Sequence, residues 1–263
     1  MLKKLLKYDF KDIYKFLSVF YILSIIFAIS TKVLLGLKQT IIIGIISQIS
    51  MGFMFSMLAS SLINTLMRNW VRFKDTLYKD ESYLTHTLPV TKSQIYESKF
   101  ILSLTNLATT FMVIIISLLI AYSSKDNLNI IISKINDISK VFNVSSITFI
   151  IFTIFILFLE IYSGLQSGFL GIIKGHKKSN NKVMYSVIFG FITYIISQLI
   201  VLFTLFILAL FNSDIMKMFT DNMITNLLVI KSMVILFSTI YVAIIICINM
   251  ICVKNLNNGV NVE

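Results

Sequence analysis

Six apolar stretches, each about 20 residues long or longer, constrain this sequence more than any other feature. The core of a soluble protein produces apolar runs of roughly 4–15 residues, whereas a helix that crosses ~30 Å of hydrocarbon needs about 20 residues at ~1.5 Å each. In lipid the backbone polar groups must be satisfied within the segment, which leaves helices as the spanning structure. The sequence therefore predicts an all-α, polytopic membrane helix bundle with six transmembrane helices.

The predicted spans follow one another with short polar connections, and we expect residues 1–263 to form a single transmembrane domain. The composition also indicates a membrane protein, because only 13% of residues are charged, against about 25% in a soluble domain. The spans are expected at about 16–37, 41–67, 100–122, 146–173, 183–211 and 230–253.

The distribution of Lys and Arg predicts an orientation. Sixteen of the 23 lie in the N-terminus, the polar stretches 68–99 and 174–182, and the C-terminal tail, and seven lie in the segments between. The side richer in Lys and Arg faces the cytoplasm, so we expect a multi-pass protein of the cell membrane with both termini cytoplasmic. The net charge of +11 is accounted for by topology and membrane lipids, and it predicts no nucleic-acid partner.

Residues 1–15 carry apolar side chains near one helical face and lysines largely elsewhere. This pattern is typical of an amphipathic helix that lies in the membrane interface. The alternative is a solvated basic tail that only sets the topology.

Motifs of enzyme active sites are missing from the sequence. It contains no GxxxxGK[ST] phosphate loop, no HExxH and no GxSxG, and its two histidines are too few for a metal cluster. We expect no catalytic residues, no metal and no bound cofactor in this chain.

The stretch Lys79–Lys99, KDESYLTHTLPVTKSQIYESK, contains the only proline, Pro89. Because proline stops helix continuation, and Thr91 or Ser93 can cap a helix that starts after it, the stretch predicts a short helix, a break and a second helix. Its apolar side chains fit docking of a partner, and equally a loop that packs on its own helices.

This stretch resembles bacterial ABC transporter permeases of the ABC-2 type, many of which carry a pattern like DEGYLTxTLPVS followed by a lysine. Ser82 stands where the family usually has glycine. The resemblance covers this loop closely and the six-span layout loosely.

The resemblance implies that residues 68–99 form a cytoplasmic loop with a short coupling helix, which contacts a separate ABC ATPase subunit. The chain would then be the permease of an ATP-driven exporter of antimicrobial peptides, lipids or drugs, paired with a second copy or a paralogue and using ATP bound to the partner. The expected ATPase-coupling residues are Asp80, Glu81, Tyr83, Leu84, Thr85, Leu88 and Pro89.

Glu160 is the one acidic residue deep inside a predicted span, where a carboxylate costs about 2.5–3.5 kcal/mol on insertion. Small residues follow it on roughly the same face, including the pairs Gly164/Gly168 and Gly171/Gly175, which permit close helix contact. Glu160, Gly164, Gly168 and Gln198 are thus candidates for a translocation path or for a helix interface.

A second class of function stays open at this point. The chain could be a stand-alone membrane protein, such as a peptide immunity or sensor protein, or an ion-coupled secondary transporter. A secondary transporter usually has an internal repeat and discontinuous helices, and the sequence has neither clearly.

Overall fold

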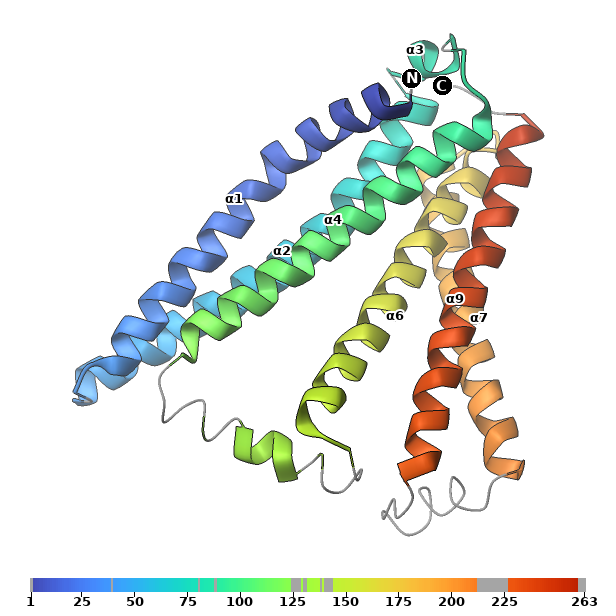
Figure 1. The fold of residues 1–263 in the computed structure, drawn as a ribbon. Helices are drawn as coiled ribbons and strands as arrows, with labels where there is room; N and C mark the ends of the chain where they lie inside the picture. The colour runs from blue at the N-terminus through green and yellow to red at the C-terminus, as the bar shows by residue number, and fades with distance from the viewer. Residues whose placement is uncertain are drawn as a thin grey trace. The chain divides into compact units, whose positions relative to one another are not determined.

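A computed structural model of the chain describes residues 2–38, 40–79, 81–87, 89–123, 129, 132–137, 139, 144–211 and 227–259. Within these ranges the regular structure is helical, and six helices are long and apolar enough to cross a membrane (Figure 1). The prediction of a polytopic helix bundle is confirmed to this extent.

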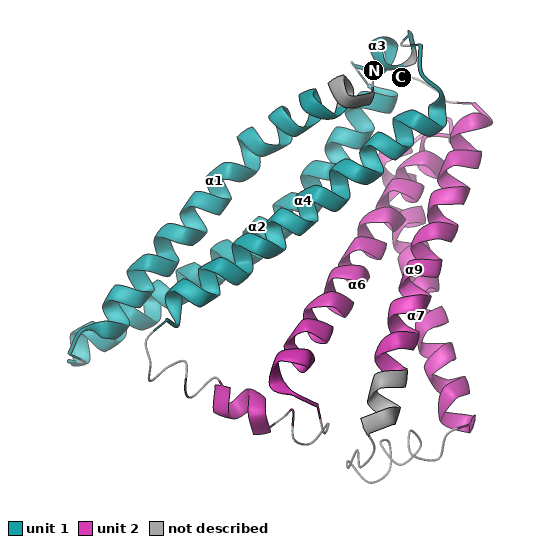
Figure 2. Cartoon of the chain, viewed as in Figure 1, with its two compact units in different colours: residues 1–129, 262–263 teal, residues 130–261 magenta. Residues whose placement is uncertain are grey.

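The helices pack as two compact units (Figure 2). The described residues up to Asn129 form unit 1, and those from Ile132 onward form unit 2.

Unit 1 contains α1 (Leu2–Gly36), α2 (Ile41–Tyr78), α3 (Ser82–Thr87) and α4 (Lys92–Ala121). The three long helices pack against one another, and α3 packs against α2. As a result, the start of α1, the end of α2, α3 and the start of α4 lie at the same end of the unit (Figure 1).

Helix α1 has no break at the expected boundary between residues 15 and 16. Ile13, Leu17 and Tyr21 share a face and pack with Leu102 of α4, which continues the helix interface across that boundary. Residues 2–15 are therefore the first turns of α1 and not a separate helix.

The loop within the polar stretch 68–99 is also shorter than expected. Helix α2 continues beyond Met67 to Tyr78, and α4 begins at Lys92. The apolar run ends at Met67, but the helix extends because Arg68 and Arg72 form ion pairs with carboxylates on neighbouring elements.

Hydrogen bonds between side chains cross the interior of unit 1. The Tyr21 and Thr110 hydroxyls lie 2.7 Å apart, Thr65 lies 2.8 Å from the same Thr110 hydroxyl, and the Asn106 amide donates to Asn69 at 3.0 Å. Such bonds contribute about 1 kcal/mol or less each between membrane helices, so the three-helix packing rests on several of them together.

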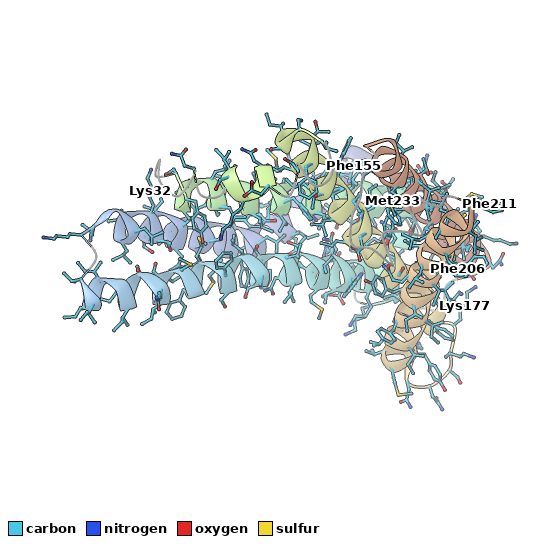
Figure 3. The ribbon with its side chains drawn as sticks, turned by 90° about the horizontal axis from the view of Figure 1, so that it is seen from below. Lys32, Phe155, Lys177, Phe206, Phe211 and Met233 are labelled. Carbon is cyan, nitrogen blue, oxygen red and sulfur yellow. The ribbon has the colours of Figure 1, made fainter. Side chains whose placement is uncertain are left out.

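Unit 2 contains α6 (Ser146–Gly175), α7 (Lys182–Phe211) and α9 (Leu227–Asn257). Helix α6 packs against both of the others. Large apolar side chains are exposed along these helices, among them Phe206 and Phe211 of α7 at 56% and 86% (Figure 3). Exposed apolar faces of this length are typical of helices in contact with lipid.

Candidate functional site

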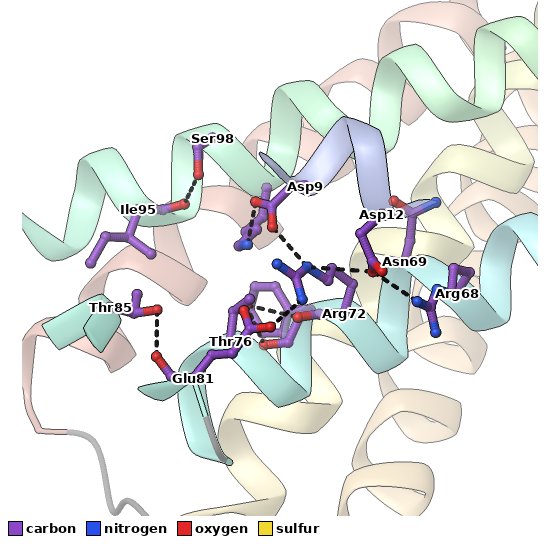
Figure 4. Close-up of polar contacts among 12 residues, drawn as sticks. Asp9, Asp12, Arg68, Asn69, Arg72, Thr76, Glu81, Thr85, Ile95 and Ser98 are labelled. Carbon is purple, nitrogen blue, oxygen red and sulfur yellow. Dashed lines mark hydrogen bonds and ion pairs between the residues drawn. The ribbon is translucent and has the colours of Figure 1, made fainter. Parts of the chain in front are cut away.

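Six charged residues at one end of unit 1 form a connected group, called here the ionic cluster (Figure 4). They come from α1, α2, α4 and the turn before α3. The members are Asp9, Asp12, Arg68, Arg72, Glu81 and Lys99.

The inner link of the ionic cluster joins α1 to α4. The Lys99 ammonium donates to Asp9 Oδ2 at 2.5 Å, and the two side chains are only 2% and 3% exposed. Asp9 Oδ1 accepts from Arg72 Nε of α2 at 2.8 Å. The Asp9 carboxylate therefore joins three helices, and it balances a buried ammonium whose desolvation would otherwise be costly.

The outer links are closer to solvent. Arg72 Nη1 donates to Glu81 Oε1 at 2.6 Å, and the Glu81 side chain is 45% exposed. Arg68 Nη2 donates to Asp12 Oδ2 at 2.7 Å. Through Arg72, the residue that precedes α3 is tied to the same carboxylate that anchors α1 and α4.

Helix α3 and its flanks confirm the expected short helix, break and second helix. Pro89 lies between the end of α3 and Thr91, whose side chain caps α4 by accepting from the Gln94 backbone N–H at 3.3 Å. The Gln94 side chain accepts from the Thr91 N–H in return, at 3.1 Å, which completes a capping box.

The expected coupling residues differ in exposure. Tyr83 and Leu84 are 77% and 67% exposed, and Pro89 is exposed as well. Thr85 is buried and donates to the Glu81 backbone carbonyl at 2.9 Å, so it holds the turn of α3 and offers no contact surface. Asp80 and Leu88 lie outside the described residues.

The second group of predicted residues lies in unit 2. Helix α6 contributes Glu160, which is half-buried and close enough to Tyr241 of α9 for electrostatic interaction. The Tyr241 hydroxyl donates to Gln198 Oε1 of α7 at 3.5 Å, and the buried Gln198 Nε2 has no hydrogen-bond partner among the described residues. Tyr241 thus lies near both Glu160 and Gln198, and the described structure has no direct hydrogen bond between those two residues.

The glycines that follow Glu160 lie where α6 meets α7. A Cβ on Gly171 would overlap the Gly190 backbone, and one on Gly175 would overlap Ser186. Near Gly164 the added carbon would meet only the Tyr194 ring at 3.5 Å. Gly168 lies opposite Gly190, whose added Cβ would come within 3.5 Å of the Gly168 Cα. Gly164 and Gly168 therefore both lie close to residues of α7.

Within the described ranges, no group of three His, Cys, Asp or Glu side chains could hold a metal ion. Cys247 is exposed and Cys252 is buried, and neither forms a disulfide in the part of the chain that the structure describes.

Sequence reasoning missed the ionic cluster, because Arg68 and Arg72 were interpreted only as topology signals and Lys99 only as a topology signal and part of the ABC-2-like stretch. Asp9 and Asp12 are spaced i, i+3 and Arg68 and Arg72 are spaced i, i+4, so each pair lies on one helix face. That spacing was the available signal, although it does not identify the partners across helices.

Comparisons with models of known protein families, with curated proteins and with solved structures found no match. The resemblance to ABC-2 permeases therefore depends on the stretch from Asp80 to Lys99 and on the six-helix layout.

Proposed function

We propose that this chain is the membrane permease subunit of an ATP-driven ABC exporter, in which ATP binds and is hydrolysed on separate ATPase subunits. Two permease chains would form the pathway. The ATPases would dock on α3, and the end of unit 1 that carries the ionic cluster would face the cytoplasm.

The observation that carries this proposal is the contrast between Glu81, which directly precedes α3, and the exposed side chains of α3 itself. Glu81 is tied to the long helices through Arg72, at 2.6 Å. Helix α3 presents Tyr83 and Leu84, which are more than two-thirds exposed. A short helix that offers an aromatic and an aliphatic anchor, and is ionically tied to three membrane helices, suits transmission of a partner's movement.

Two further parts of the proposal concern the membrane. The first turns of α1, rich in lysine, would lie at the level of the cytoplasmic lipid headgroups. Glu160, Tyr241 and Gln198 would supply polar groups to the translocation path, because three helices bring them together in an otherwise apolar segment.

The proposal is tested by purifying the tagged chain from its native membranes in mild detergent. We expect an ATPase with Walker motifs to co-purify in stoichiometric amount. The double substitution Tyr83→Ala and Leu84→Ala should reduce its recovery at least tenfold. A matched control is Ile41→Ala, which truncates an 87% exposed apolar side chain at the first residue of α2.

The stand-alone alternative makes the opposite prediction. If the pure chain, reconstituted without an ATPase, moves a substrate on an ion gradient, the exporter proposal is wrong.

A further inference from the structure

A polar pocket of about 250 Å³ opens beside the ionic cluster in unit 1. Three cationic and three anionic side chains line it. Three of the six come from α2 and a fourth is its C-cap residue, Lys79, at intervals of three or four residues that place them on one side. The lining residues are Asp12, Arg68, Arg72, Asp75, Lys79 and Glu81.

Four of these six side chains already neutralise one another within the protein. Arg68 pairs with Asp12, and Arg72 pairs with Glu81. The remaining two, Asp75 and Lys79, make no ion pair or hydrogen bond through their side chains in the described structure. Asp75 is half-buried, which makes an unmatched carboxylate more costly than one in water.

Arg68 adds an unmatched donor to the same pocket. Its Nη2 is bonded to Asp12, but its Nε is buried and has no hydrogen-bond partner among the described residues. Within the described residues, Arg68 Nε therefore has no acceptor, and no cationic side chain, Lys79 included, pairs with Asp75. A ligand that carries an anionic oxygen and an ammonium group satisfies both.

Along α2, Arg68 lies closer than Asp75 to the apolar part of the helix. Arg68 directly follows the last residue of the apolar run, and Asp75 lies seven residues further on, or about 10 Å along the axis at ~1.5 Å per residue. A phospholipid that carries ethanolamine has the same order, with its phosphate next to the acyl chains and its ammonium beyond.

The surface next to Arg68 suits an acyl chain. The Arg68 guanidinium lies over the Phe16 ring at 5.5 Å, and Phe16 is 42% exposed. Further along α1, Val19 and Ile22 are 54% and 57% exposed. A chain that leaves the pocket would thus continue over apolar side chains.

We propose that this pocket binds a phosphoethanolamine group, with its phosphate at Arg68 and its primary ammonium at Asp75. The geometry fits the headgroup of a phospholipid, and the free zwitterion has the same chemistry. This inference does not depend on the proposed function, since it concerns the chain by itself.

The test uses the full-length chain in detergent and native mass spectrometry with lipids of matched acyl chains. Phosphatidylethanolamine should bind at least tenfold more tightly than phosphatidylcholine, whose quaternary ammonium has no N–H to donate to Asp75. It should exceed phosphatidylglycerol, which has no ammonium, by a similar factor. Asp75→Asn should remove this preference, because a hydrogen bond to a charged group typically changes affinity by about tenfold or more.

Glu97→Gln is the matched control, since it neutralises an exposed carboxylate on α4 that lies outside the pocket and bonds to Ser93 at 3.1 Å. Lipid preference should be unchanged in this variant. Equal retention of the three lipids, or an unchanged preference in Asp75→Asn, would overturn the proposal.

Competition with soluble phosphoethanolamine distinguishes whether the pocket binds a phospholipid headgroup or the free zwitterion. Failure of millimolar phosphoethanolamine to displace the lipid assigns the pocket to a membrane lipid. Displacement assigns it to the free zwitterion, and either result supports recognition of the phosphoethanolamine group.

Discussion

At the scale of single residues, Asp9 is a buried carboxylate held by two cationic side chains. Its two oxygens accept from Lys99 of α4 and Arg72 of α2, and its side chain is 3% exposed. A carboxylate in this environment cannot be replaced by water, so its removal leaves a buried ammonium without a counter-charge.

We therefore expect Asp9→Asn to lower the free energy of unfolding by about 3–5 kcal/mol, the usual effect of removing one partner of a buried ion pair. Denaturant titration in detergent micelles measures this change. Asp12→Asn is the control, since the Asp12 side chain is 38% exposed and its pair with Arg68 should contribute only about 0–1 kcal/mol.

A double substitution separates pairing from packing. With Lys99→Met added to Asp9→Asn, most of the lost stability should return, because no unpaired charge stays buried. If the double variant is less stable than Asp9→Asn alone, the ionic explanation is incorrect.

The ionic cluster also illustrates the limit of sequence reasoning at this scale. Thr91 as the cap of α4 and Pro89 as a break could be predicted, because both effects are local to the backbone. The partnership of Asp9 with Lys99 could not, since it joins residues 90 positions apart and depends on how α1 packs against α4.

At the scale of helices, Glu81 ties α3 to α2 through an ion pair that reaches solvent. We expect Glu81→Gln to weaken this tie and to increase amide hydrogen exchange within α3 several-fold, while exchange in the middle of α2 and α4 stays unchanged. Hydrogen–deuterium exchange with mass spectrometry resolves the two regions. Unaltered exchange in α3 would show that its packing against α2 holds it without the ion pair.

A second prediction at the scale of helices concerns the glycines at the contact between α6 and α7. Gly171→Ala forces a carbon into the Gly190 backbone, so the two helices must separate and unit 2 should be destabilised by more than about 1 kcal/mol. Gly164→Ala introduces only an ordinary 3.5 Å contact with Tyr194 and should have little effect. Thermal unfolding of both variants in the same detergent compares them, and equal melting temperatures would contradict the close-packed interface.

Helix boundaries show why elements were only partly predictable. Hydropathy placed the six apolar cores correctly, because lipid-facing segments must be apolar along most of their length. It ended the second span at Met67, whereas α2 continues for 11 more residues to Tyr78. Hydropathy indicates where the lipid-facing segment of a helix ends. Helix α2 extends further because Arg68 and Arg72 form ion pairs with carboxylates on neighbouring elements.

At the scale of the whole molecule, the chain combines six apolar helices with one structured polar end in unit 1. The helices account for residence in a membrane, and the ionic cluster joins α1, α2 and α4 to the short helix α3. In the proposed exporter the chemistry belongs to another subunit, and this chain supplies the pathway and the docking helix.

Site-specific photo-crosslinking in native membranes tests that claim most directly. A photoreactive residue replacing Tyr83 should crosslink the full-length chain to an ATPase with Walker motifs, and the yield should change when a non-hydrolysable ATP analogue is added. The same residue at position 41 should give no such product. Efficient crosslinking at position 83 only to lipid or to a second copy of the chain, in membranes that contain the native ATPases, would contradict the account.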